Sequence, residues 1–84
     1  MAVYVDNSRN KFRGMVMCHM VADTPGELHN MADSIGIKIE HFQGDARTPH
    51  YDLSISKRNL AISKGAIEVN RKQLGKVIRS IKKR

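Results

Sequence analysis

The sequence predicts a small α/β domain in which three helices cover a mostly parallel, four-stranded sheet, in the order β-β-α-β-α-β-α. Two observations support this prediction. After two initial apolar segments, short segments rich in β-branched residues alternate with segments whose apolar residues recur at helical spacing. Strands that alternate with helices are usually joined by right-handed crossovers, which make the strands parallel. A chain of 84 residues has room for one hydrophobic core, so residues 1–84 should form a single domain.

The first two strands are predicted from their apolar residues. Residues 2–5 read Ala-Val-Tyr-Val and precede a polar run, which predicts a short first strand. Residues 7–14 are polar and basic and should form a loop. Residues 15–21 are apolar nearly throughout, which is typical of a strand that is covered on both faces, as in a parallel sheet.

The first helix has the strongest local signal in the chain. Thr24 can accept a hydrogen bond from a free backbone N–H, and Pro25 suits the first helical position because it has no N–H. Glu27 can complete a capping box with Thr24. Apolar residues then recur at helical spacing as far as residue 35, and Gly36 can adopt the left-handed conformation that ends a helix.

The second half of the chain is predicted to contain two more strands and a second helix. Isoleucines alternate with charged residues over residues 37–42, which predicts the third strand, and residues 43–49 should form a loop. Apolar spacing predicts a helix over residues 54–64 that ends at Gly65. Residues 66–69 read Ala-Ile-Glu-Val and should form the last strand.

A basic helix is expected at the C-terminus, over residues 71–84. Asn70 can cap it, and its apolar stripe consists of Leu74, Val77, Ile78 and Ile81. The net charge of the chain is +7, and seven of its 15 lysines and arginines lie in this segment. Such a segment attracts polyanions, so it should hold nucleic acid or an acidic host protein unless it is only a solvated helix face. The residues expected to contact nucleic acid are Lys72, Lys76, Arg79, Lys82 and Lys83.

Several classes of protein are excluded by composition and by missing motifs. The single cysteine, Cys18, lies in an apolar run and should be a buried, inert thiol rather than part of a disulfide scaffold. No segment has the roughly 18 apolar residues that span a bilayer, and no basic flank precedes an apolar leader, so a cytoplasmic protein without membrane contact is expected. The Gly-rich phosphate loops of ATPases and dehydrogenases and the nucleophile elbow of α/β-hydrolases are missing from the sequence.

Candidate functional residues gather near the predicted strand ends, where ligands bind in open α/β sheets. The candidate catalytic residues are His19, Asp23, His50 and Asp52. The candidate ligand-binding residues are Asp6, His29, Tyr51 and Arg58. Imidazole and carboxylate groups bind divalent transition metals and also transfer protons, so a divalent metal ion of unknown identity is a candidate cofactor.

Some of these residues also have a purely structural interpretation. Asp23 would support the turn before Thr24, Asp52 would cap the second helix, and His29 would be a solvated helix residue. Tyr51 could stack on a base, but such a tyrosine is more often a core residue with its hydroxyl at the surface. None of the spacings between these residues forms a named metal-binding signature.

Several blocks of the sequence resemble a small bacterial and phage family catalogued as domain of unknown function 4031. The resemblance runs over about residues 2–69 and leaves the basic terminal helix uncovered. The blocks are Val3–Asp6, His19–Thr24 with Glu27–His29, Pro49–Leu53, Arg58 with Ala61, and Gly65–Ala66. The resemblance implies that His19, Asp23, His29, His50, Asp52 and Arg58 occupy family motif positions. It implies no activity, because the family is named for lacking one.

Two functions of different classes agree with these features. In the first, the strand-end loops bind a phosphate-bearing ligand such as a nucleotide or nucleic acid, and Arg58 pairs with the phosphate. Metal-dependent hydrolysis of this ligand is one form that the activity could take. The alternative is a non-catalytic phage or bacterial accessory protein that binds its partner through the basic C-terminal helix. A metal ion held purely for structure is a third interpretation. The domain could act alone or as a small oligomer.

Overall fold

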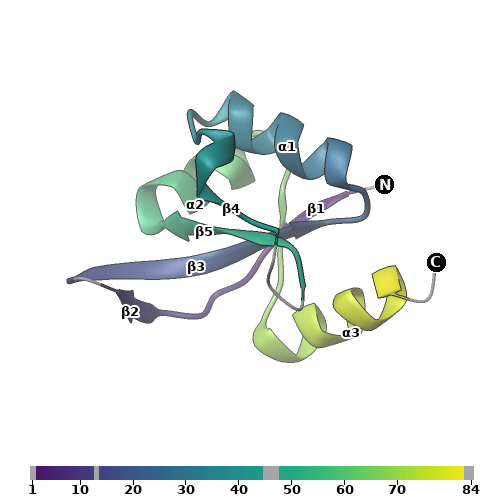
Figure 1. Ribbon diagram of the computed structural model, residues 1–84. Helices are drawn as coiled ribbons and strands as arrows, with labels where there is room; N and C mark the ends of the chain where they lie inside the picture. The colour runs from purple at the N-terminus through teal and green to yellow at the C-terminus, as the bar shows by residue number, and fades with distance from the viewer. Residues whose placement is uncertain (1, 13, 45–47, 83–84) are drawn as a thin grey trace.

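The computed structural model describes residues 2–12, 14–44 and 48–82, which form a sheet with helices on both of its faces (Figure 1). The elements run in the order β1 (Val3–Val5), β2 (Asn10–Phe12), β3 (Met15–Ala22), α1 (Pro25–Ser34), the 3-10 helix η1 (Ile39–His41), β4 (Phe42–Gln43), β5 (His50–Ser54), α2 (Ile55–Ser63), β6 (Ile67–Glu68) and α3 (Arg71–Lys82). The predicted α/β class and its three helices are therefore confirmed.

The sheet is mostly antiparallel, so the predicted mostly parallel, four-stranded sheet is wrong. Its strand order is β4-β5-β3-β1-β6, and β2 pairs with the first half of β3. Within the described ranges only β1 and β6 pair in parallel. The apolar run of β3 was interpreted as a fully covered parallel strand, but Met15 at its beginning is exposed. The run instead reflects the central position of the second half of β3, which has strands on both sides.

The third predicted strand is also wrong, and a different segment pairs with β3. Residues 37–42 contain the turn of η1 and only the first residue of the two-residue strand β4. The alternation of isoleucines with charged residues does not produce a buried strand face here, because Ile39 is 67% exposed. The strand next to β3 is β5, which was expected to be loop and helix start. Tyr51 and Leu53 of β5 are buried while the residues between them are not, which is the alternation typical of a strand.

The helices confirm the predicted starts and ends. The Glu27 amide donates to Thr24 Oγ1 at the start of α1, and the Lys57 amide donates to Ser54 Oγ at the start of α2. Ser54 thus caps α2, in place of the suggested Asp52. Asn70 and Gln73 exchange two hydrogen bonds at the start of α3. No helix in the part of the chain that the structure describes combines the length and the apolar character needed to cross a membrane.

The two faces of the sheet carry different layers. One face packs against α1 and α2 and forms the main core, which includes Val5, Met20, Leu53 and the buried ring of Tyr51. The other face is partly covered by α3, where Val21 of the sheet meets Leu74 and Val69 in a smaller cluster. Because side chains alternate along a strand, the odd-numbered residues of β3 and the even-numbered residues of β5 point to the α3 side.

Candidate metal centre

The register between β3 and β5 brings three polar side chains together on the α3 side of the sheet. His19 of β3 pairs directly with Asp52 of β5, and His50 lies two residues before Asp52 on the same face. The three residues offer ligand atoms that all lie within 4.8 Å of one another. The cluster therefore forms on paired strands and not in the loops after them, because His19 lies within β3 and β5 includes both Asp52 and its own first residue, His50.

Both imidazoles approach the same carboxylate oxygen. Asp52 Oδ1 lies 3.9 Å from His19 Nε2 and 3.3 Å from His50 Nε2. The two rings meet edge to face with their centroids 5.3 Å apart. Two ligand atoms held about 2.1 Å from one tetrahedral metal ion lie about 3.4 Å from each other, so this arrangement is close to the geometry of a coordination site.

The hydrogen bonds of the two histidines orient their Nε2 atoms toward this point. His19 Nδ1 lies 2.8 Å from Asp6 Oδ2, and His50 Nδ1 lies 2.7 Å from the Thr48 carbonyl oxygen. Both partners only accept hydrogen bonds, so each Nδ1 carries the proton. In the neutral rings, the Nε2 lone pairs then point toward a carboxylate, an arrangement that a shared cation would stabilise.

Asp6 is buried and is positioned by a bulge in the chain. Between the β1 and β2 pairings, the four residues 6–9 lie opposite only Cys18 and His19 of β3. The Asp6 carboxylate accepts hydrogen bonds from the His19 amide at 2.8 Å and from Ser8 Oγ at 2.8 Å. It is 1% exposed. Burial raises the pKa of Asp6, but the hydrogen bonds from His19 and Ser8 outweigh it and hold the pKa below its ordinary value.

The charge around His19 favours a cation at this position. The hydrogen bond to Asp6 raises the pKa of His19; burial opposes it, the charges of Asp6 and Asp52 reinforce it, and the nearby charge of Arg71 weakens it. The net effect is a raised pKa, so a positive charge on this imidazole is stabilised. A metal ion at Nε2 would take the place of the proton while Nδ1 continues to donate to Asp6.

Arg58 lies behind this centre and not in it. Its side chain is almost fully buried, with Nε donating to the Asp6 carbonyl at 2.7 Å and Nη2 paired with Glu68. Two of its three nitrogens thus already have acceptors. Arg58 therefore fixes the end of β1 in place, next to the carboxylate that supports His19.

Three other predicted residues lie apart from the cluster. Asp23 Oδ2 accepts a hydrogen bond from the Ala2 amide at 2.7 Å, which ties the end of β3 to the beginning of the described chain. The Tyr51 hydroxyl lies 2.8 Å from His29 Nδ1, and the rings of both residues contact Phe42. Tyr51 is thus a core residue, as its structural interpretation stated, but its hydroxyl bonds to His29 and does not lie at the surface. Burial raises the pKa of Tyr51. Cys18 is a buried free thiol, as expected.

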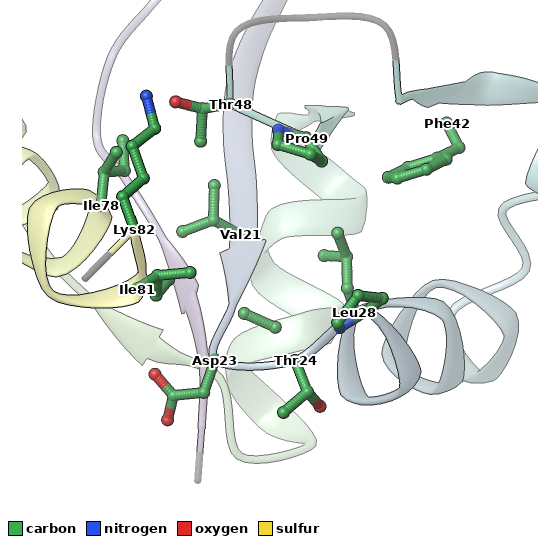
Figure 2. A pocket seen from close by; sticks show the side chains of 12 residues that line it. Val21, Asp23, Thr24, Leu28, Phe42, Thr48, Pro49, Ile78, Ile81 and Lys82 are labelled. Atoms are coloured by element: carbon green, nitrogen blue, oxygen red, sulfur yellow. The ribbon is translucent and has the colours of Figure 1, made fainter. Parts of the chain in front are cut away.

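The predicted basic helix is present as α3, and its lysines and arginine are largely solvent-exposed. Lys72, Lys76, Arg79 and Lys82 are exposed, while Lys83 lies outside the described residues. Lys82 also lines an apolar pocket of about 100 Å³ between Ile78 and Ile81 of α3 and the side chains of Leu28 and Phe42 (Figure 2). The pocket lining lacks His19, His50 and Asp52. The cluster is therefore separate from this pocket.

Three residues near the cluster had no sequence signal strong enough to identify them. Ser8 and Thr48 contribute through a hydroxyl and a backbone carbonyl that only the folded chain brings close. Arg71 was counted only as part of the basic helix, although its charge acts on His19. The alternation of His50, Asp52 and Ser54 with buried residues was the one sequence feature that could have placed His50 and Asp52 on a common face.

Comparison with models of protein families shows which family this chain is related to. A model described as protein of unknown function DUF4031 matches residues 3–81, which is nearly the whole chain. The chain belongs to the DUF4031 family. The DUF4031 match extends to residue 81, so it includes most of α3, which the resemblance noted above had left out. Searches of curated proteins and of solved structures gave no significant match.

Proposed function

We propose that His19, His50 and Asp52 bind a divalent transition metal ion and that the protein uses this ion to bind and hydrolyse a phosphate-bearing ligand. One observation carries the proposal: two imidazole Nε2 atoms, each with its Nδ1 hydrogen-bonded to an acceptor, converge on one carboxylate oxygen. Nitrogen and oxygen ligands of this kind suit zinc and related ions.

The outer residues support a metal ion in the way that metalloproteins commonly do. A histidine that ligates a metal usually donates its other N–H to a carboxylate or a carbonyl, which fixes the ring. Here Asp6 supplies the carboxylate for His19, and Thr48 supplies the backbone carbonyl for His50. Ser8 in turn holds Asp6, so the orientation of His19 depends on a chain of three residues.

The centre has the features of a catalytic metal site. Three protein ligands leave a coordination position open, whereas structural zinc sites usually have four. The side chains remain partly accessible, at 34% for His19, 20% for His50 and 39% for Asp52. A bound ion supplies Lewis-acid polarisation and an activated water, which is the chemistry that hydrolysis requires. The excess of positive charge on the chain favours an anionic ligand.

Metal binding is tested by titrating the metal-free protein with zinc in a calorimeter. The wild-type protein should bind one ion per chain, and His50→Ala and Asp52→Ala should each weaken binding at least tenfold, because each removes one of three ligands. The matched control is His41→Ala, an exposed histidine of η1 outside the cluster. Wild-type affinity in both His50→Ala and Asp52→Ala would refute the metal site.

Hydrolysis is tested on the zinc-loaded protein with p-nitrophenyl phosphate and its diester. The expected result is release of p-nitrophenol that requires zinc and is lost in Asp52→Ala. Metal-free His50→Ala and Asp52→Ala should unfold within a few degrees of the wild type, because both side chains are partly accessible. A large loss of stability would indicate a structural role for the cluster.

A second candidate function rests on the exposed basic side of α3. Lys72, Lys76 and Arg79 are exposed on this helix. If they bind nucleic acid, replacing all three with Gln should weaken the binding of a labelled oligonucleotide and flatten its salt dependence, because fewer counterions are released. Fluorescence anisotropy at several salt concentrations measures both effects. Unchanged binding in the triple variant would reject this function.

A further inference from the structure

A groove opens beside Asp52, next to the candidate metal centre. Its volume of about 450 Å³ lies within the range of roughly 300–1,000 Å³ that is typical of small-molecule sites. Asp52 forms one part of its lining, and the rest of the lining includes Met15, Met17, Lys38 and Lys57. The groove is therefore continuous with the candidate centre through one of its three ligands.

Strand pairing sets the direction in which the groove leaves the centre. Met17 and Met15 lie two and four residues before His19 in β3, so their side chains point to the same face as that histidine. Met17 pairs with Ser54, which lies two residues after Asp52 in β5 and also lines the groove. At about 3.4 Å per residue, Met17 and Met15 lie about 7 and 14 Å from His19 along the strand. A ligand that is bound at the centre therefore reaches Met17 first and Met15 second.

The two methionines present an accessible apolar surface. Met15 is 54% exposed, and Met17 is half-buried. Among the described residues, neither core cluster includes Met15 or Met17, so these side chains are not needed to fill the interior. Figure 1 shows α3 beside the end of β3 and away from its start, where the methionines lie. Because a thioether is polarizable and packs well against an aromatic ring, this surface suits an aromatic group.

The groove also contains two lysines, whose charge favours an anionic ligand. Lys38 is exposed, and Lys57 is held in place because its Nζ donates a hydrogen bond to the Ile35 carbonyl at 2.6 Å. The described acidic residues of the lining are Glu40 and Asp52. A metal ion bound by Asp52 would offset the charge of that carboxylate, which leaves Glu40 against two lysines. A lysine ammonium is also attracted to the face of an aromatic ring.

We propose that this groove binds the organic group of the phosphate ester, and that this group carries a flat aromatic ring that packs on Met17 and Met15. The proposal rests on the metal centre proposed above, which would hold the phosphoryl group, and it names the class of substrate. The distance of about 7 Å from His19 to Met17 favours a ring that a spacer separates from the phosphate, as the sugar does in a nucleotide. Met15 and Met17 are specificity-determining residues and take no part in the chemical step.

The contact is tested by NMR of the zinc-loaded protein with 13C-labelled methionine methyl groups. Adenosine 5′-monophosphate and ribose 5-phosphate share the sugar and the phosphate and differ in the aromatic base. The base should shift the methyl signals of Met15 and Met17 through its ring current, whereas ribose 5-phosphate should shift them clearly less. Met20, which is fully buried in the core, is the internal reference and should not respond. If adenosine 5′-monophosphate leaves both signals unchanged on the zinc-loaded protein, the groove assignment is overturned.

Replacing both methionines gives a second test. The double variant Met15→Ala and Met17→Ala should bind adenosine 5′-monophosphate about tenfold more weakly, because two sulfur–aromatic contacts are lost, and should bind ribose 5-phosphate within about twofold of the wild type. Zinc affinity should not change, since neither methionine belongs to the candidate ligands. Leu60→Ala, which shortens an exposed apolar side chain of α2 outside the described groove lining, is the control. An equal loss of affinity for both ligands would show that the methionines do not contact the base.

Zinc titration of the same samples separates this proposal from the metal centre. Failure of the wild-type protein to bind zinc would overturn the metal centre, and the groove assignment with it. Zinc binding combined with equal affinities for adenosine 5′-monophosphate and ribose 5-phosphate would overturn the groove assignment and leave the metal centre in place.

The source of the aromatic ring is distinguished by comparing adenosine 5′-monophosphate with a dinucleotide that carries a 5′-phosphate. Both should shift the methyl signals of Met15 and Met17 if the groove assignment is correct. Tighter binding of the dinucleotide would identify a nucleic-acid strand as the source, whereas equal or weaker binding would identify a free nucleotide. Dinucleotide binding that shifts neither signal would count against the groove.

Discussion

At the scale of single residues, the candidate metal centre depends on the buried carboxylate of Asp6, which orients the candidate ligand His19 and is not one of the three candidate ligands itself. Asp6 receives hydrogen bonds from Ser8, from the His19 amide and from the His19 ring, and its own carbonyl accepts one from Arg58. The residue thereby connects the end of β1, the middle of β3 and the start of α2. Its substitution should affect both stability and metal affinity.

Asp6→Asn is expected to lower the free energy of unfolding of the metal-free protein by about 1–3 kcal/mol, because an amide cannot satisfy the donors that surround the carboxylate. Metal affinity should fall by about 10- to 100-fold, as is typical when an outer partner of a ligating histidine is lost. Urea denaturation and zinc titration measure the two effects. Asp33→Asn, an exposed carboxylate of α1, is the control. Unchanged zinc affinity in Asp6→Asn would contradict the supporting role.

The individual histidines show why residue type alone did not identify the site. His29 and His41 have the same chemistry as His19 and His50, yet His29 contacts Tyr51 and His41 lies exposed in η1. The sequence predicted a group of histidines and carboxylates, and the structure brings His19, His50 and Asp52 together. Their selection follows from strand register, which single residues do not encode.

At the scale of elements, two glycines should respond to the same substitution in opposite ways. Gly36 ends α1 with φ of 81°, and a Cβ there would lie 3.2 Å from Lys57 Nζ, so Gly36→Ala should destabilise the fold by about 1 kcal/mol. Gly75 is helical and has open space around it, so Gly75→Ala should stabilise the fold by about 0.5–1 kcal/mol. Thermal unfolding of both variants checks the signs. A loss of stability in Gly75→Ala would show that α3 packs more closely than described.

The segment that contains β1, β2 and β3 supplies His19 of the candidate centre and the carboxylate of Asp6 that supports it, while β5 supplies His50 and Asp52. Its bulge at residues 6–9 turns Asp6 back toward His19, because four residues must lie opposite two. The sequence predicted this segment as a loop, since it is polar and basic. The predicted loop over residues 7–14 was correct for residues 7–9 but missed β2, which follows the bulge.

At the scale of the whole molecule, the core and the candidate metal centre lie on opposite faces of one sheet. The core residues pack against α1 and α2, while His19, His50 and Asp52 lie on the α3 side. The fold should therefore not require the metal. The effect of metal removal therefore distinguishes a ligand-binding metal ion from a purely structural one, because removal of a structural metal ion unfolds the protein.

Zinc at 100 times its dissociation constant should stabilise the protein by about 2.7 kcal/mol, because it binds the folded state. The melting temperature should rise by about 10 °C or more, given the size of the domain. A chelator should return it to that of the metal-free protein, which remains folded. Differential scanning fluorimetry measures both steps, with Asp52→Ala as the control, which should respond clearly less than the wild type at the same zinc concentration. Unfolding by the chelator would instead support the structural interpretation.

The sequence by itself determined the helices and the inventory of chemical groups. Caps and breakers act within a few residues, so Thr24, Gly36, Gly65 and Asn70 marked the ends of helices correctly. The tertiary structure alone decided strand order, direction and register, because these depend on contacts between residues far apart in the chain. That pairing placed His19 opposite Asp52 and formed the bulge that brings Asp6 to His19.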